Sequence, residues 1–200
     1  MRTRILDASL AVVREKGYAA ATVDDLCAKA GVTKGAFFHH FDSKEALGVA
    51  AADYWSQLTG ELFKGAPYHR HADPLDRFLG YIDFRGELLQ GKVPEFTCLV
   101  GTMVQETYET HPAIRDACQR SIFGHAREVA KDIEAAKKIH APHAAWTAES
   151  LALHTQAVLQ GSFILAKAEG SVAVAADGVA HLRRYVEFLF QKNQTGKTNQ

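Results

Sequence analysis

The chain of 200 residues contains little cysteine, proline or tryptophan, and it carries no excess of either charge. Its three cysteines, Cys27, Cys98 and Cys118, have no close spacing, which excludes the disulfide framework of a small secreted scaffold and favours a reducing cytoplasm. Basic and acidic residues number 23 each, so any nucleic-acid site must be local rather than a consequence of net charge. No run of about 18 apolar residues is present, and we therefore expect no membrane partner.

The residues that are present indicate helices along the whole chain. Apolar side chains recur at intervals of three and four, and we find neither an alternating strand pattern nor an internal repeat. Prolines in GKVP, THP and HAPH separate long predicted helices at 74–90, 95–109, 112–139, 146–168 and 175–191. The polar C-terminal stretch QKNQTGKTNQ is expected to fray. The predicted fold class is all-α.

Residues 22–41 are predicted to form two short helices joined by a tight turn at Gly31, with Thr22 and Thr33 as N-caps. The second helix carries Phe37, Phe38, His39, His40 and Phe41 in succession, so these side chains must point in several directions. Phe37 and Phe41, four residues apart, are expected to face a core, and the other three to face outward. In a helix-turn-helix the second helix lies in the DNA major groove, although short helix pairs also occur as plain structure.

The stretch from Gly17 to Leu47 resembles the signature of the TetR family of transcriptional regulators. The matching positions are Gly17-Tyr18, Thr22-Val23, Asp25-Leu26, the run Ala30-Gly31-Val32-Thr33-Lys34-Gly35, Phe38, His40-Phe41, Lys44-Glu45 and Leu47. The resemblance implies a three-helix DNA-binding domain at residues 1–48 and a helical effector-binding and dimerisation domain at residues 49–200. It further implies a homodimeric repressor that binds palindromic double-stranded DNA and is released by a small-molecule effector.

Carried over by position, the resemblance also implies which residues face DNA. They are Thr33, Lys34, Ala36, Phe38, His39, His40 and Lys44. Phe38 stands where the family usually has tyrosine, whose hydroxyl contacts a phosphate. Because that hydrogen bond is lost here, we expect His39 or His40 to contribute more to DNA binding.

The last two predicted helices carry a 3–4 apolar spacing that is typical of bundle packing. We predict a homodimer interface made by Leu151, His154, Val158, Gly161, Leu165, Val179, Leu182, Val186 and Leu189. Gly161 would allow a close approach of two backbones, and His154 is expected to be a hydrogen-bonded interface residue. The alternative is that the same stripe belongs to a large monomeric core.

Cys98 lies in PEFTCLVGTMVQE, near the predicted start of a helix. This run resembles a subgroup of TetR-like regulators with a cysteine at this helix start, some of which respond to electrophiles or oxidants. A thiol near a helix N-terminus can have a lowered pKa and react as thiolate. The sequence therefore leaves two interpretations open, an electrophile- or redox-sensing repressor and a small buried core residue.

The other chemical residues give weaker signals. The pairs His69 with His71 and His140 with His143 lack ligand spacing with a third acidic or thiol partner, so we expect no metal and no cofactor. The sequence has no phosphate loop, nucleophile elbow or metalloprotease motif, which predicts that the protein is not an enzyme and leaves an all-α enzyme as a remote alternative. Residues that could line an effector pocket are Phe84, Met103, Tyr108, Phe123, His125 and Trp146.

Overall fold

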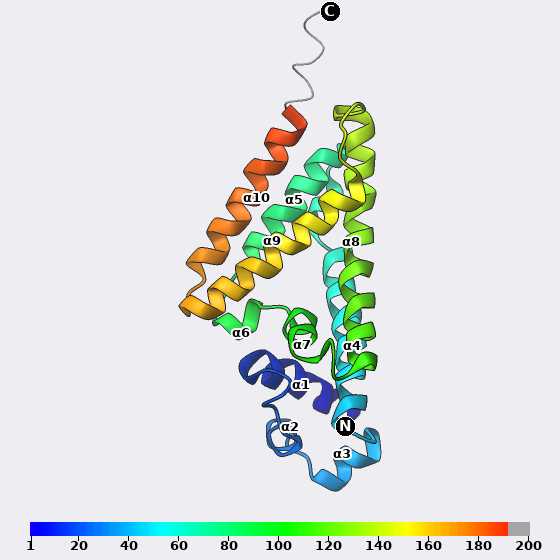
Figure 1. Cartoon of the computed structure of the whole chain (residues 1–200), viewed down its shortest axis with the longest axis vertical. Helices are drawn as coiled ribbons and strands as arrows, with labels where there is room; N and C mark the ends of the chain where they lie inside the picture. Colours follow the sequence, from blue (N-terminus) through cyan, green and yellow to red (C-terminus); the bar gives the residue numbers. More distant parts are fainter. Residues whose placement is uncertain (192–200) are drawn as a thin grey trace, which may run out of the picture. The chain divides into compact units, whose positions relative to one another are not determined.

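The computed structural model describes residues 1–191 (Figure 1). Its elements are α1 (Arg2–Lys16), α2 (Val23–Ala30), α3 (Lys34–His40), α4 (Lys44–Lys64), the 3-10 helix η1 (Pro67–Arg70), α5 (Pro74–Glu87), α6 (Val93–Phe96), α7 (Leu99–Thr107), α8 (Pro112–His140), α9 (Ala148–Glu169) and α10 (Ala173–Gln191). No strand occurs within this range, and the predicted all-α fold class is confirmed. None of the described helices combines the length and the apolarity that crossing a bilayer requires. The fraying expected for residues 191–200 falls on residues outside the described range, except for Gln191, which ends α10.

The helices form two compact units, and each unit is made from two separate segments of the chain. Unit 1 comprises Met1–Leu62 and Thr97–Ile122, and unit 2 comprises Phe63–Phe96 and the chain from Phe123 onward. Unit 1 thus contains α1–α3 together with α7, while α4 and α8 each contribute residues to both units. The functional boundary that we expect near residue 48 concerns binding roles, and it remains a prediction.

An apolar core holds the first three helices together in unit 1. On α1, Leu6, Leu10 and Val13 follow the helical repeat and are buried. Phe37 of α3 is completely buried in the same core. Full burial of such a side chain contributes about 1.5–3 kcal/mol relative to leaving it in water. The later segment of the chain adds Leu99, Val100, Met103, Ile114, Ala117 and Cys118 to this core.

The helix predicted at 95–109 is interrupted. α6 ends at Phe96 and α7 begins at Leu99. Between them Cys98 has an extended backbone (φ −82°, ψ 123°), and its Sγ accepts a hydrogen bond from the backbone N–H of Gly101 at 3.4 Å. The break was not predicted because a capping residue can interrupt the helical backbone without disturbing the spacing of the apolar residues.

In unit 2, α10 packs against both α5 and α9. A Cβ added to Gly178 of α10 would lie only 2.2 Å from Oγ of Ser162 on α9, so the two helices approach closely at this glycine. Arg183 of α10 donates from Nε to Asp83 Oδ1 of α5 at 2.6 Å. These contacts fix α9, α10 and α5 as one packed group.

This packing corrects part of the predicted dimer interface. Leu151, Val179, Leu182 and Val186 are at most 6 % exposed within the single chain. Their 3–4 spacing reflects the packing of α9, α10 and α5 on one another, because ridges of side chains in one chain follow the same spacing as a dimer seam. These four side chains are therefore core residues of unit 2 and are not free to contact a partner.

A different face of α9 and α10 carries the exposed apolar residues. We define the α9–α10 face by His154, Gly161, Ile164, Leu165, Tyr185 and Phe188. Leu165 is 55 % exposed and Phe188 is 56 % exposed, and a Cβ on Gly161 would meet nothing within 4 Å. The rings of His154 and Tyr185 lie 5.0 Å apart and join the two helices across this face. Val158 and Leu189, also in the predicted interface, are half-buried.

Candidate nucleic-acid interface

α2 begins with a reciprocal pair of hydrogen bonds between Thr22 and Asp25. The backbone N–H of Asp25 donates to Thr22 Oγ1 at 3.1 Å, and the backbone N–H of Thr22 donates to Asp25 Oδ2 at 3.0 Å. Lys16 Nζ lies 2.6 Å from Asp25 Oδ1. Hydrogen bonds from Lys16 and then from Thr22 hold the pKa of Asp25 far below its usual range, so the carboxylate keeps its capping role at neutral and mildly acidic pH.

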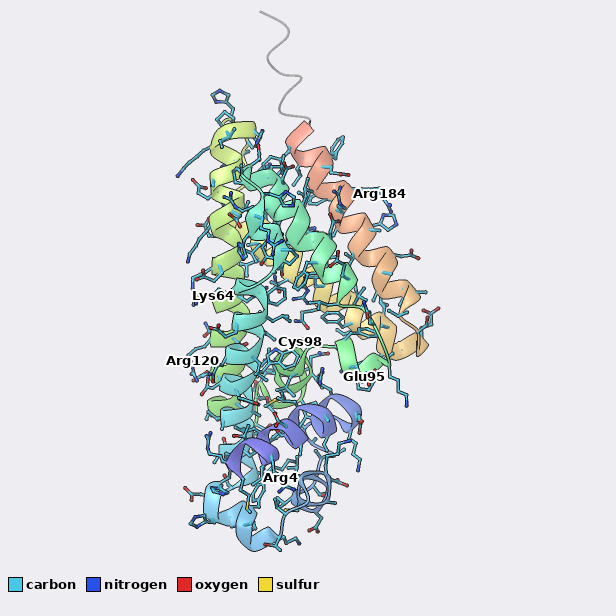
Figure 2. The ribbon with its side chains drawn as sticks, turned by 180° about the vertical axis from the view of Figure 1, so that it is seen from behind. Arg4, Lys64, Glu95, Cys98, Arg120 and Arg184 are labelled. Atoms are coloured by element: carbon cyan, nitrogen blue, oxygen red, sulfur yellow. The ribbon has the colours of Figure 1, made fainter. Side chains whose placement is uncertain are left out.

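The turn between α2 and α3 depends on Gly31 and on an arginine of α1. Gly31 has φ +62°, a left-handed conformation that favours glycine. Arg4, which is labelled in Figure 2, donates from Nη2 to the carbonyl oxygen of Ala30 at 2.7 Å. The same nitrogen would lie 2.9 Å from a Cβ added to Gly31. Arg4 therefore ties α1 to the end of α2 and fixes the direction in which α3 begins.

α3 places its consecutive aromatic residues on opposite sides. Thr33 caps the helix by accepting a hydrogen bond from the backbone N–H of Ala36 at 3.1 Å. Phe37 and Phe41 are 0 % and 4 % exposed, whereas Phe38 is 51 % exposed. The prediction that Phe37 and Phe41 face the core is confirmed, and Phe38 is left on the outer side of α3.

The predicted DNA-facing residues lie between the start of α3 and the first residue of α4, within unit 1. Of this set, Thr33, Lys34, Phe38 and His39 are exposed, and Ala36, His40 and Lys44 are half-buried. The group offers a hydroxyl, two ammonium groups, two imidazoles and an aromatic face. Such groups can contact phosphates, base edges and the methyl of thymine.

Two members of this set have shifted pKa values, in opposite directions. Lys34 Nζ lies 2.8 Å from Asp24 Oδ1, and this hydrogen-bonded carboxylate raises the pKa of Lys34. Burial, and then the neighbouring imidazole of His39, lower the pKa of His40, which favours a neutral ring at neutral pH. A neutral imidazole can donate one hydrogen bond and accept another. On one short helix, Lys34 therefore offers a positive charge and His40 a neutral ring that can both donate and accept a hydrogen bond.

Lys44 contacts the turn between α1 and α2. Its Nζ lies 4.5 Å from the centroid of the Tyr18 ring and donates to the carbonyl oxygen of Ala19 at 3.2 Å. Burial lowers the pKa of Lys44. Lys44, which the resemblance places in the DNA-facing set, thus also supports residues 18 and 19.

Glu106 of α7 holds the same turn, a role that the sequence does not predict. Its Oε2 accepts a hydrogen bond from the backbone N–H of Ala19 at 2.7 Å. Gly17 has φ +86°, and an added Cβ there would lie 2.5 Å from Glu106 Oε1. The two partners are 87 residues apart, and no local pattern in the sequence could indicate their contact.

The three cysteines have distinct surroundings. Burial, and then Cys98, raise the pKa of Cys118 to about 12, and burial also raises the pKa of Cys27. Both thiols are therefore held in the unreactive protonated form. Cys98 is half-buried and is the residue that caps α7 (Figure 2).

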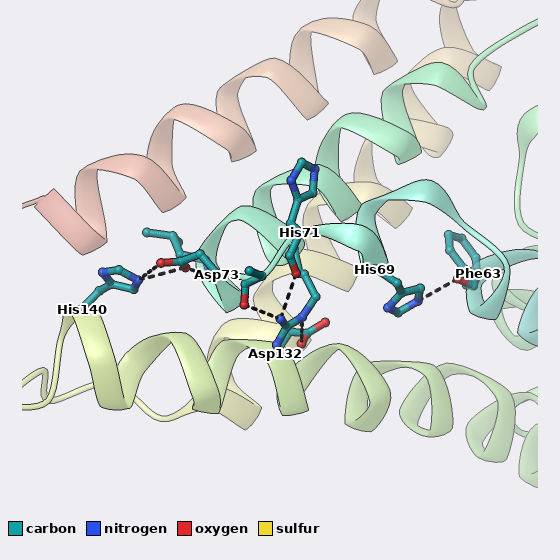
Figure 3. A network of polar contacts seen from close by, with 9 residues as sticks. Phe63, His69, His71, Asp73, Asp132 and His140 are labelled. Atoms are coloured by element: carbon teal, nitrogen blue, oxygen red, sulfur yellow. Dashed lines mark hydrogen bonds and ion pairs between the residues drawn. The ribbon is translucent and has the colours of Figure 1, made fainter.

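Two of the four histidines that raised the question of a metal, His69 and His140, form side-chain hydrogen bonds in unit 2 (Figure 3). His140 Nε2 lies 2.8 Å from Oδ2 of Asp73, the residue that caps α5. His69 Nε2 lies 3.0 Å from the carbonyl oxygen of Phe63. Among the described residues, no three histidine, cysteine, aspartate or glutamate side chains come together in a way that could hold a metal ion.

The aromatic residues suggested for an effector pocket do not form one group. Met103 lies in the core of unit 1, and Tyr108 is 58 % exposed. Trp146 packs on Phe190 in unit 2 with ring centroids 5.3 Å apart. Phe123 is exposed. Phe84 and His125 share a neighbour, because the ring of Phe63 lies 5.8 Å from the first and 4.6 Å from the second.

Comparison with known proteins agrees with this geometry. Residues 5–51 match the profile described as "Bacterial regulatory proteins, tetR family", and residues 74–175 match "Transcriptional regulator LmrA/YxaF-like, C-terminal domain". The chain belongs to the TetR family of bacterial transcriptional regulators. These matches describe regulators and not enzymes, which confirms the prediction on this point.

Two relatives show how far the sequence likeness extends. The repressor DhaR of Mycobacterium sp. (strain GP1) is 28% identical over 116 residues, covering 58% of this chain and 56% of DhaR. The repressor KstR2 of Rhodococcus jostii (strain RHA1) is 44% identical over 46 residues, covering 23% of this chain and 22% of KstR2. The matched stretch spans little more than half the length of DhaR and less than a quarter of the length of KstR2.

Solved structures share the fold over nearly the whole chain. A TetR-family regulator from Agrobacterium tumefaciens superposes with a TM-score of 0.80 at 16% identity and covers 92% of this chain and 96% of its own. A TetR regulator from Chloroflexus aurantiacus J-10-FL also gives a TM-score of 0.80, at 24% identity and with 93% of both chains covered.

Proposed function

We propose that this protein is a cytoplasmic repressor that binds a palindromic operator as a homodimer and is released by a small-molecule effector. The observation that carries the proposal is the two-sided character of α3, with Phe37 buried in the core and Phe38 exposed beside exposed His39. A helix anchored in this way can present its outer side to the major groove. The names of the relatives DhaR and KstR2, both called repressors, support the sign of regulation.

Within this proposal the DNA-facing residues have separate roles. Thr33, Lys34 and Lys44 contact phosphates, which positions the protein without reading sequence. Ala36 and His39 contact base edges, and Phe38 and His40 lie beside them. Because Lys34 is paired with exposed Asp24 in the free protein, DNA binding exchanges one exposed ion pair for a contact with phosphate.

The homodimer is assigned to the α9–α10 face. Its exposed apolar residues, Ile164, Leu165, Tyr185 and Phe188, would be removed from water by a second copy of the chain. Gly161 leaves open space on α9 where another backbone can approach. A symmetric pair brings two copies of α3 to successive half-sites about 34–36 Å apart.

Release follows from a shift between two dimer arrangements. An effector that binds better to an arrangement with a different spacing of the two α3 helices lowers the affinity for DNA. Because the coupling is reciprocal, DNA lowers the affinity for the effector by the same free energy. α4 and α8 provide continuous helices for this coupling, since each contributes residues to both units.

Footprinting on DNA from beside the protein's own gene tests the proposal. We expect two protected half-sites related by a palindrome and a complex that contains an even number of chains. Leu165→Glu should produce monomers in analytical ultracentrifugation and lose the footprint, while Glu169→Gln, an exposed change at the end of α9, should do neither. A single half-site occupied by a monomer would contradict the proposal.

A second candidate effector is an electrophile or mild oxidant that modifies Cys98. The favouring observation is the hydrogen bond from the N–H of Gly101 to Cys98 Sγ, which would be disturbed by a group added to the sulfur. α7, which Cys98 caps, packs against α1 in unit 1. Cys98→Ser should keep operator binding and lose the response to an alkylating agent, whereas Cys118→Ser should keep both. A Cys98→Ser protein that still responds would return Cys98 to a purely structural role.

A further inference from the structure

The interior of unit 2 contains a chain of polar side chains. Gln156 Nε2 donates to the hydroxyl of Tyr81 at 3.1 Å, and the same hydroxyl lies 2.9 Å from His125 Nε2. Tyr81 is 2 % exposed and Gln156 is 6 % exposed. We assign the tautomer in which this hydroxyl donates its proton to His125 Nε2 and the imidazole proton is on Nδ1. Within residues 1–191 that Nδ1–H has no acceptor.

His125 is a neutral donor rather than a cation. Burial, and then the charge of Arg85, lower the pKa of His125 to about 4. At neutral pH the ring therefore offers one N–H and no positive charge. The effect of Arg85 on this pKa also indicates that its guanidinium lies near the imidazole.

Arg85 differs from other arginines of unit 2. Its guanidinium carbon lies 5.3 Å from the ring centroid of Phe63 and 5.7 Å from that of Phe163, both of them buried rings. Within the described chain this half-buried guanidinium has neither a carboxylate partner nor a hydrogen-bond acceptor. Arg183, by contrast, pairs with Asp83 and Glu187, and Arg77 pairs with Asp132.

Within residues 1–191 these donors have no protein acceptor, and they lie beside aromatic rings without being completely buried. Partly buried cations are normally paired, because removing a charge from water is unfavourable. A guanidinium presents a planar fork of N–H groups that matches a carboxylate, and the N–H of His125 adds one more donor. One cation beside a neutral imidazole balances one negative charge. The ligand that fits this arrangement is therefore a monoanion with a flat apolar part.

We infer that Arg85 and His125 bind the carboxylate of a small aromatic monocarboxylic acid, whose apolar part contacts Phe63 and Phe163. The inference rests on the proposed function in taking this acid as the effector. It places the effector site inside unit 2, with Tyr81 and Gln156 orienting the imidazole of His125.

Matched acids and amides test the inference with the full-length protein. The probes are benzoate, phenylacetate and cinnamate, each compared with its neutral amide by isothermal titration calorimetry. At least one acid should bind, and its amide should bind roughly ten- to a hundredfold more weakly because it lacks the charge-assisted hydrogen bonds. Arg85→Met should weaken acid binding by a similar factor, and Arg85→Lys by less, while Arg127→Met, on an exposed position of α8, should leave it unchanged.

Circular dichroism checks that each variant is folded. If Arg85→Met does not fold, Arg85→Lys replaces it in the binding measurement. Equal binding of acids and amides, acid binding that survives the loss of Arg85, or the absence of binding by every acid would each overturn the inference.

A separate operator-release measurement keeps this inference distinct from the proposed function. If an acid binds through Arg85 but leaves the protein on its operator, the carboxylate site stands and the effector role fails. If a neutral compound releases the protein from DNA and Arg85→Met does not alter that release, the proposed function stands and the carboxylate inference is wrong.

Discussion

Unit 1 and unit 2 bury different kinds of side chain. The core of unit 1 is mainly aliphatic and aromatic, and its charged residues Arg4 and Lys44 contact backbone carbonyls at the edge of that core. Unit 2 links buried Tyr81 and Gln156 to half-buried His125 by hydrogen bonds, beside an arginine that no carboxylate of the described chain neutralises. An apolar core stabilises one arrangement, whereas a polar interior with open donors is stabilised further when a ligand completes it.

The largest expected effect tests the apolar side of this comparison. Phe37→Ala should lower the free energy of unfolding by about 3–5 kcal/mol, because it removes a fully buried ring from the core of unit 1. Phe38→Ala, the adjacent exposed position, should change it by less than about 0.5 kcal/mol and weaken operator binding instead. Urea denaturation and a mobility shift on both variants measure the two quantities. Similar stability losses would show that α3 is not anchored through one side.

The next effect tests the polar interior of unit 2. Because the pKa of folded His125 is about 4, below the 6.5 of an unperturbed histidine, protonation favours the unfolded chain. The contribution of His125 to the free energy of unfolding is complete above pH 6.5 and falls progressively as the pH drops to about 4, by at most about 3 kcal/mol. His125→Gln should lack this dependence.

Urea denaturation between pH 4 and pH 7 measures the difference in the free energy of unfolding between the parent and the His125→Gln variant. The contributions of the other titrating groups are the same in both proteins and cancel in this difference. Parallel stability curves for the two proteins across that range would show that His125 is not held neutral by the interior of unit 2.

The smallest effect concerns a charge at the edge of unit 1. Lys44→Ala should weaken binding to all DNA sequences and reduce the salt dependence of the binding constant by about one counterion for each subunit contact. Lys138→Ala, an exposed lysine of unit 2, should leave that slope unchanged. If Lys44 only supports the turn through Tyr18 and Ala19, its loss lowers stability and affinity but leaves the salt slope of the parent.

The parts that the sequence could predict are those that depend on near neighbours. The cap at Thr22 is predicted from Asp25 three residues on, the cap at Thr33 from the helical residues that follow it, and the burial of Phe37 and Phe41 from their spacing on one helix. The 3–4 stripe of Leu151, Val179, Leu182 and Val186 was misassigned to a dimer, because spacing does not distinguish a neighbour in the same chain from one in a partner. Glu106 and Arg85 were missed because their partners are distant in sequence.

The two-segment construction of unit 1 has a consequence for the order of folding. Residues 1–62 are synthesised first, but the core that holds α1–α3 also needs Leu99, Met103 and Ile114, and the turn at Ala19 needs Glu106. Between these segments the ribosome makes residues 63–96, which belong to the other unit. The shared core of helices α1–α3 is therefore completed only when the later segment has been made. During translation, a nascent chain that ends before Leu99 would leave exposed the apolar surface of α1 that packs against α7.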